Sequence, residues 1–223
     1  MTGKLFVQAV IKFLAGVILV GALVFLSAGT FDFFHGWLLM AILFVPMFAA
    51  GIVMLFKNPE LLRSRLNAKE KLKEQSLVVK LSGLMFLVGF ITAGLGVRFD
   101  WYVLPRSVSI GAAVVFLGAY ILYAEVLREN TYLSRTIQVQ ENQKVIDTGL
   151  YGIVRYPMYS VTLLLFLSMP LVLGSVYAFI VFLVYPFIIA KRIKSEERFL
   201  RENLSGYREY MEKVKYRLIP FVW

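Results

Sequence analysis

Two short groups of charged and aromatic residues lie at opposite ends of an apolar stretch, residues 156–190, which contains no Lys, Arg, Asp or Glu. The first group, residues 149–159, runs into the start of the stretch, and the second, residues 192–197, follows its end. If the stretch folds back on itself as a hairpin, the two groups meet at one membrane surface and can form a single pocket. The charges and rings of the two groups are those of Tyr151, Arg155, Tyr156, Tyr159, Arg192, Glu196 and Glu197.

These residue types are suited to binding a cofactor that has cationic and polar parts. A glutamate can pair with an ammonium group or accept hydrogen bonds from ribose hydroxyls, a tyrosine ring can face a cation, and an arginine can bind a carboxylate through two parallel hydrogen bonds. The chain has no cysteine and a single histidine, His35. This composition excludes thiolate metal sites and two-histidine metal motifs.

Each of these residues also has a purely structural interpretation. Arg192 and Glu196 are four residues apart and could form a surface ion pair on a helix, which contributes only ~0.3–0.5 kcal/mol. Glu197 and Arg201 have the better orientation for such a pair, so we expect Glu197 to support an exposed helix surface. Arg155 could be a positively charged anchor next to a membrane helix, and the tyrosines could belong to an interfacial aromatic belt.

The composition indicates an integral membrane protein made of helices. Of the 223 residues, 59% are hydrophobic and 17% are charged, and the mean hydropathy is +0.73. A helix needs ~20 apolar residues to cross a bilayer. Four runs satisfy this before residue 130: Leu5–Thr30, Phe33–Phe56, Leu77–Val97 and Leu104–Leu127. The predicted fold class is therefore an all-α, polytopic integral membrane protein.

The part after the four spans is expected to contain a tight helical hairpin and a cytosolic helical tail. Pro170 and the pair Gly174-Ser175 supply a break near the middle of the hairpin. Residues 191–223 continue as the tail, which Ser205-Gly206 interrupts, and residues 218–223 are suited to fold back on the membrane interface. We predict one membrane domain, 1–223, with four spans in 1–127 and cytoplasmic cofactor-binding segments around the hairpin in 128–223.

The charges of the loops predict the orientation of the chain. Basic residues in short loops accumulate on the cytoplasmic side, and the connection between the second and third spans is strongly basic, whereas the first connection offers only Asp32. Its basic residues are Lys57, Arg63, Arg65, Lys69, Lys71 and Lys73. We therefore expect both termini to be cytoplasmic, and a compact chain without targeting tails suits a prokaryotic inner membrane.

Five motifs in order around the hairpin resemble the isoprenylcysteine carboxyl methyltransferase family and its phospholipid-methyltransferase relatives, over roughly residues 130–220. The motifs are Thr148-Gly-Leu-Tyr-Gly-Ile-Val-Arg-Tyr-Pro-Met-Tyr159, the apolar hairpin, Arg192-Ile-Lys-Ser-Glu-Glu197, Gly206-Tyr-Arg-Glu-Tyr210 and Tyr216-Arg-Leu-Ile-Pro220. The resemblance implies an integral membrane methyltransferase that uses S-adenosyl-L-methionine. It also implies a lipophilic small-molecule or prenylated acceptor that enters from the membrane lipids, and no nucleic acid.

The resemblance also implies roles for individual residues. It assigns cofactor binding to Gln143, Lys144, Val145, Ile146, Tyr151, Tyr156, Pro157, Met158, Tyr159 and Glu196. It assigns catalysis to Arg155, which opens the motif Arg-His-Pro-x-Tyr, and to Arg192, which matches the arginine associated with substrate and methyl transfer. This sequence departs from the motif at Tyr156, where the family usually has histidine. Tyrosine can replace histidine in stacking or hydrogen bonding, but not in proton transfer at neutral pH.

The missing histidine favours an oxygen acceptor over a nitrogen acceptor. Methyl transfer from a sulfonium to a carboxylate joins opposite charges and needs alignment rather than a general base. An amine acceptor would first have to lose a proton. Two alternatives stay open at this point, namely an NADPH-dependent membrane reductase similar to sterol reductases, and a non-catalytic membrane scaffold or small transporter.

Overall fold

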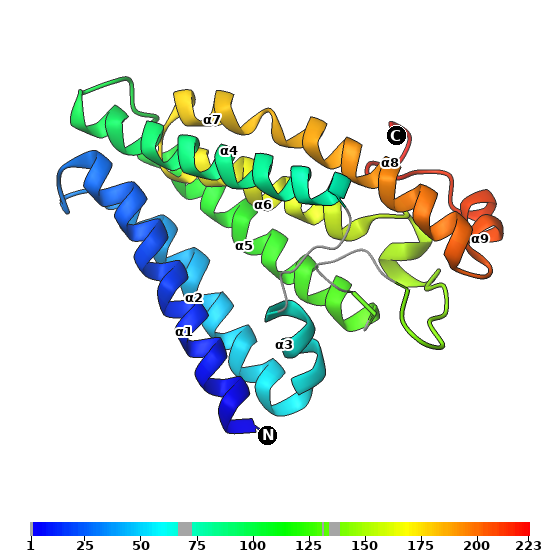
Figure 1. The fold of residues 1–223 in the computed structure, drawn as a ribbon. Coiled ribbons are helices and arrows are strands. Elements are labelled where there is room, and N and C mark those ends of the chain that lie inside the picture. Colours follow the sequence, from blue (N-terminus) through cyan, green and yellow to red (C-terminus); the bar gives the residue numbers. More distant parts are fainter. Residues whose placement is uncertain (1, 67–72, 131, 134–138) are drawn as a thin grey trace.

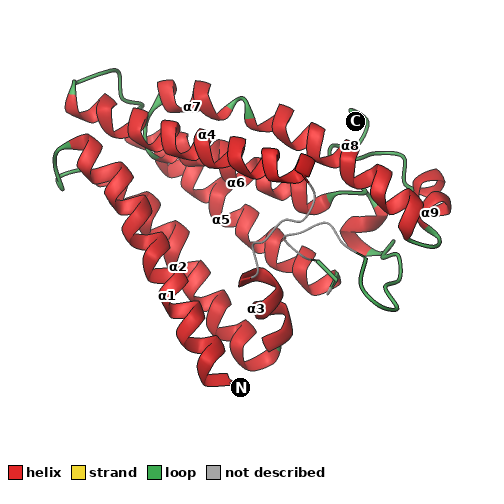
Figure 2. Cartoon of the chain, viewed as in Figure 1, coloured by secondary structure: helices red, strands yellow, loops and turns green. Residues whose placement is uncertain are grey.

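The computed structural model describes residues 2–66, 73–130, 132–133 and 139–223, and the regular secondary structure of these residues is helical (Figure 2). Lys69 and Lys71, which contribute to the predicted orientation, lie outside the described residues. The helices in chain order are α1 (Thr2–Gly21), the π-helical η1 (Ala22–Leu26), α2 (Phe34–Lys57), α3 (Pro59–Leu66), α4 (Lys73–Arg98), α5 (Arg106–Glu129), the 3-10 turn η2 (Gly149–Gly152), α6 (Pro157–Val172), α7 (Val176–Phe182), α8 (Tyr185–Asn203) and α9 (Tyr207–Lys213).

Several helices are long and apolar enough to cross a bilayer. Within the described residues there are five such stretches, namely Gly3–Leu26, Phe34–Lys57, Ser76–Arg98, Arg106–Glu129 and Val176–Asn203. A further apolar helix, α6, has 16 residues and is about 24 Å long at ~1.5 Å per residue, slightly less than the ~30 Å hydrocarbon core. The chain is a polytopic all-α integral membrane protein, as the sequence predicts.

The apolar stretch 156–190 folds as the predicted hairpin. Its turn lies at Gly174-Ser175, where Gly174 adopts a left-handed φ of +70° and the Ser175 hydroxyl oxygen accepts the Ala178 N–H at 3.1 Å, capping α7. Pro170 does not form the break, because α6 continues past it to Val172. The sequence did not predict the second interruption, at 183–184, between α7 and α8.

The hairpin tip contacts the loop between α4 and α5. The Leu104 N–H donates to the Gly174 carbonyl at 2.8 Å, and Val103 pairs with Ser175 in an isolated bridge. These contacts place the tip at the same end of the bundle as this loop, so that the two open ends of the hairpin emerge together at the other end.

Close packing joins the hairpin to α4. The Phe86 ring meets the Phe166 and Phe182 rings edge to face, with centroids 4.8 and 5.3 Å apart. Gly89 lies directly against Phe182, and a Cβ there would lie 2.3 Å from the Phe182 ring. Helix α5 lies along α6. Helices α1 and α2 pack on each other and diverge from the bundle of the other long helices, and they meet it where η1 contacts α4 (Figure 1).

The tail folds back onto the base of the hairpin. Gly206, with a φ of +80°, separates α8 from α9, which confirms the predicted interruption at Ser205-Gly206. After α9 the chain returns, and the Arg155 and Tyr156 N–H groups donate to the Tyr216 and Arg217 carbonyls, both at 2.9 Å. Leu218 is buried, whereas residues 219, 221 and 222 are exposed. Their contact with the membrane interface remains a prediction.

Candidate functional site

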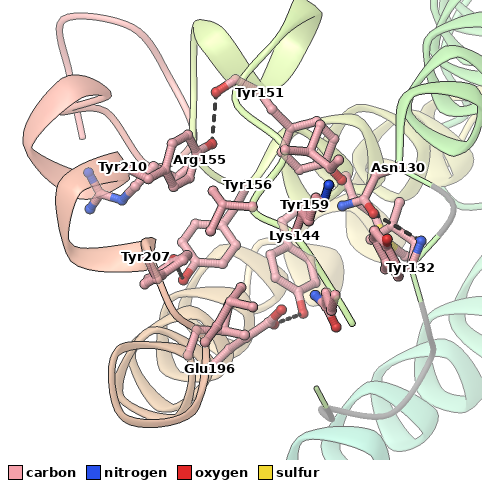
Figure 3. A pocket seen from close by; sticks show the side chains of 17 residues that line it. Asn130, Tyr132, Lys144, Tyr151, Arg155, Tyr156, Tyr159, Glu196, Tyr207 and Tyr210 are labelled. Atoms are coloured by element: carbon pink, nitrogen blue, oxygen red, sulfur yellow. Dashed lines mark hydrogen bonds between the residues drawn. The ribbon is translucent and has the colours of Figure 1, made fainter. Parts of the chain in front are cut away.

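A pocket lies between the ends of the hairpin, the loop 139–148 and α9 (Figure 3). Its enclosed part has a volume of about 100 Å³. The 17 lining residues are Asn130, Tyr132, Leu133, Gln143, Lys144, Val145, Ile146, Tyr151, Arg155, Tyr156, Met158, Tyr159, Glu196, Leu200, Leu204, Tyr207 and Tyr210.

The structure brings most of the sequence-predicted site residues to this pocket. Those that line it are Gln143, Lys144, Val145, Ile146, Tyr151, Arg155, Tyr156, Met158, Tyr159 and Glu196. Two predicted residues do not line it. Pro157 is buried at the first position of α6, where a missing N–H is tolerated. Arg192 is not a lining residue, but its Nε donates to the hydroxyl of the lining residue Tyr159. The assigned roles of all these residues remain predictions.

The Tyr159 hydroxyl lies between an arginine and a glutamate of α8. Arg192 Nε donates to it at 2.7 Å, and the hydroxyl in turn donates to Glu196 Oε2. The two α8 residues are one helical turn apart and therefore face the same side. Because Tyr159 is buried and holds both neighbours, the Glu196 carboxylate is fixed at the pocket surface.

Aromatic rings form much of the pocket wall. The Tyr156 and Tyr159 rings are stacked, with centroids 5.8 Å apart and planes inclined by 24°. The Tyr156 hydroxyl lies 2.6 Å from that of Tyr207, and the Tyr210 hydroxyl donates to the Tyr151 carbonyl at 2.7 Å. Two hydrogen bonds thus attach α9 to the segment that leads into α6. Burial raises the pKa of Tyr207, so its hydroxyl stays protonated at neutral pH.

Glu197 does not support an exposed helix surface, and the expected pairing with Arg201 is wrong. Its side chain is buried and accepts a hydrogen bond from Arg155 Nη2 at 3.0 Å. Arg217 binds both of its oxygens, through Nε and Nη2, each at 2.9 Å. The reason is that the returning tail covers this face of α8 and brings Arg217 to the carboxylate, while Arg155 reaches it from the segment before α6.

The guanidinium of Arg155 also forms hydrogen bonds with the returning tail. Besides Glu197, it donates through Nη1 to the Val214 and Lys215 carbonyls at 2.6 and 2.8 Å. The side chain is 4% exposed. These contacts give Arg155 a role in holding the tail against α6, which the sequence did not predict.

Sequence reasoning missed seven lining residues: Asn130, Tyr132, Leu133, Leu200, Leu204, Tyr207 and Tyr210. A signal existed for some of them. Leu200 and Leu204 follow Glu196 at intervals of four, which is the spacing of one helix face, and Tyr207 and Tyr210 belong to the motif Gly206-Tyr-Arg-Glu-Tyr210. The residues after α5 carry no comparable pattern.

The pocket fits a ligand with cationic, anionic and hydroxyl groups. The Tyr151 hydroxyl is buried and makes no well-formed hydrogen bond with the described residues, although Asn130 lies beside it (Figure 3). A buried polar atom of this kind is suited to a ligand partner. Glu196 supplies a carboxylate, Lys144 a cation, and the stacked pair of tyrosines a face for a positive charge.

Comparison with known proteins adds two findings. Residues 107–206 match the family model described as phospholipid methyltransferase. The Delta(14)-sterol reductase of Mus musculus is 25% identical over 120 residues, which cover 48% of this chain and 29% of the mouse protein. The chain therefore spans less than a third of the length of this curated relative.

Proposed function

We propose that this chain transfers a methyl group from S-adenosylmethionine to a lipophilic acceptor at the cytoplasmic membrane surface, because residues 107–206 match the family model described as phospholipid methyltransferase. The observation that carries the proposal is the Tyr159 hydroxyl held between Arg192 and Glu196 in the wall of a tyrosine-lined pocket. A prokaryotic inner membrane is the proposed location.

The lining residues offer partners for the charged groups and the hydroxyl groups of the methyl donor. Glu196 would hold the ribose hydroxyls or the amino group, and Lys144 would attract the carboxylate. The rings of Tyr156 and Tyr159 would face the sulfonium. When bound, S-adenosylmethionine supplies a methyl group that is electrophilic because it sits on a positively charged sulfur.

The finer proposal is that the acceptor is a carboxylate. The methyl carbon then forms a bond to oxygen as its bond to sulfur breaks, and a cation and an anion become a neutral thioether and a neutral ester. No proton moves, which agrees with a pocket whose buried tyrosines are held protonated by raised pKa values. Arg192 would orient the carboxylate, whereas the N–H groups of Arg155 that bind Glu197, Val214 and Lys215 serve the tail.

Labelled donor tests the proposal directly. The purified protein in lipid nanodiscs is incubated with methyl-labelled S-adenosylmethionine and a lipid extract, and the labelled lipid is then treated with base. Release of the label as methanol is the expected result and identifies a methyl ester. Glu196→Gln should lose the transfer, whereas Glu202→Gln, an exposed glutamate on the same helix, should retain it. Base-stable label would contradict the carboxylate, and no labelled lipid would contradict the methyl transfer.

A reductase is the second candidate, because the mouse protein that matches part of the chain is a Delta(14)-sterol reductase. The 2′-phosphate of NADPH needs cationic partners. The cations that line the described pocket are Lys144 and Arg155, and Arg155 already donates to three groups of the protein. Binding of NADPH in competition with S-adenosylmethionine, or in its place, would favour the reductase. Binding of neither would favour a scaffold.

A further inference from the structure

We infer that Glu129, the last residue of α5, is a positioning residue that holds the Tyr151 side of the pocket in place. Its two carboxylate oxygens lie 3.1 and 3.0 Å from the Leu150 nitrogen and share that N–H as a hydrogen-bond donor. Glu129 does not line the pocket. The role in ligand binding rests on the proposed function, but the contact itself does not depend on it.

The residue before Leu150 has to be a glycine for this contact to form. Gly149 adopts a φ of +52°, a conformation that residues with a side chain rarely adopt. A Cβ at Gly149 would lie 1.5 Å from Glu129 Oε1, which is far inside any allowed contact. The positive φ of Gly149 and its lack of a side chain therefore both allow the turn to come close to the Glu129 carboxylate.

The turn that Glu129 holds is too short to be stable alone. η2 has four residues. The Tyr151 and Gly152 N–H groups donate to the Thr148 carbonyl at 3.0 and 3.2 Å, and the Ile153 and Val154 N–H groups donate to the Leu150 carbonyl at 3.2 and 3.1 Å. Isolated 3-10 turns of this length are weak, because their hydrogen bonds are poorly aligned. A bond from Leu150 to a charged acceptor adds an anchor that ties the turn to a membrane helix.

The turn carries two features of the pocket. The Tyr151 side chain is buried in the wall with its hydroxyl beside Asn130 (Figure 3). The Tyr151 carbonyl accepts the Tyr210 hydroxyl of α9 at 2.7 Å. If the turn shifts, the Tyr151 side chain in the pocket wall and the Tyr151 carbonyl that supports α9 shift together. Removal of the Glu129 carboxylate should therefore weaken ligand binding, although Glu129 itself does not contact the ligand.

Hydrogen exchange tests the contact in the ligand-free protein. Glu129→Ala should raise the exchange rate of the amides of residues 149–152 about tenfold, because the Leu150 N–H loses its charged acceptor. The matched control is Glu125→Ala, one turn earlier on α5, where the carboxylate pairs with Arg128 on the surface. Equal exchange in the Glu129→Ala variant and the wild type would overturn the inference.

Binding of S-adenosylmethionine tests the consequence. Glu129→Ala should raise the Kd and the KM for this ligand about tenfold with a smaller change in kcat, and Glu129→Gln should restore most of the affinity, because an amide oxygen can still accept the Leu150 N–H. Wild-type affinity in the alanine variant would refute the positioning role. A wild-type protein that does not bind this ligand refutes the proposed function, and hydrogen exchange then still decides whether Glu129 holds the turn. If the alanine variant does not fold, Glu129→Asp, whose carboxylate is one methylene too short, takes its place.

Discussion

The Tyr156 hydroxyl lies 2.6 Å from the Tyr207 hydroxyl and joins the start of α6 to α9. Tyr156 occupies the position where the family that this sequence resembles usually has histidine. Both tyrosines are buried, and burial raises the pKa of each. The two tyrosines therefore join two walls of the pocket through a hydrogen bond and are not suited to act as an acid and a base.

Single and double substitutions should reveal the contribution of this hydrogen bond to stability. Tyr207→Phe leaves the buried Tyr156 hydroxyl without its partner and should lower the free energy of unfolding by about 1–3 kcal/mol. The double variant Tyr156→Phe/Tyr207→Phe removes both polar groups and should cost less than the sum of the single changes. Thermal unfolding in detergent measures both effects. Strict additivity would show that the hydroxyls do not interact.

The adjacent glutamates of α8 should have separate effects. Glu196→Gln should weaken S-adenosylmethionine binding at least tenfold and leave the melting temperature unchanged, because Glu196 lines the pocket. Glu197→Gln should cost about 3 kcal/mol of stability, because it leaves the buried Arg155 without its counter-charge. Isothermal titration and thermal unfolding separate the two outcomes.

A third variant serves as the control for the Glu197 contact. Arg201 is exposed on the same helix and was the partner expected from spacing alone, so Arg201→Ala should leave stability unchanged. A loss of stability equal to that of Glu197→Gln would support an ion pair between Glu197 and Arg201. It would contradict the ion pairs of Glu197 with Arg155 and Arg217.

The stability of the tail should depend on alkaline pH. In the folded state burial raises the pKa of Tyr207 and Tyr210 above the ordinary value of 10.0. Below pH 10 these tyrosines are protonated in both states, so they add no pH dependence there. Above pH 10 the unfolded chain loses the protons first, and the free energy of unfolding falls as pH rises. The part of the tyrosinate absorbance that Tyr207→Phe and Tyr210→Phe remove should appear only as the protein unfolds, and its appearance at pH 10 in the folded protein would contradict the burial of these two side chains.

Much of the fold follows from local properties of the sequence. Runs of apolar residues predict the membrane helices because their length has to match the bilayer. Gly174-Ser175 and Ser205-Gly206 predict turns because glycine and serine determine the backbone conformation only within a few residues of the chain. The break at 183–184 was not predicted, although Pro186, in the first turn of α8, is a signal for a helix start.

The contacts of Glu197 and Glu129 could not be predicted in this way. Glu197 is four residues from Arg201, which makes a surface pair the natural expectation, but its arginines come from positions 155 and 217. Glu129 meets Leu150 across 21 residues. Such pairs depend on how the tail and loops return to the helices, which helix spacing does not encode. The pocket residues themselves were found because five motifs surround one hairpin.

The last prediction concerns the sides of the membrane. The chain has no cysteine, so a single introduced cysteine reports one position. Lys4→Cys and Glu209→Cys should react with a membrane-impermeant thiol reagent from the cytoplasmic side, because the basic loop before α4 favours that side. Asp32→Cys and Tyr102→Cys, exposed at the other end, should react from outside. Labelling of Lys4→Cys and Glu209→Cys from opposite sides would mean an odd number of crossings, and labelling of Glu209→Cys from outside would place the pocket on the side away from the cytoplasm.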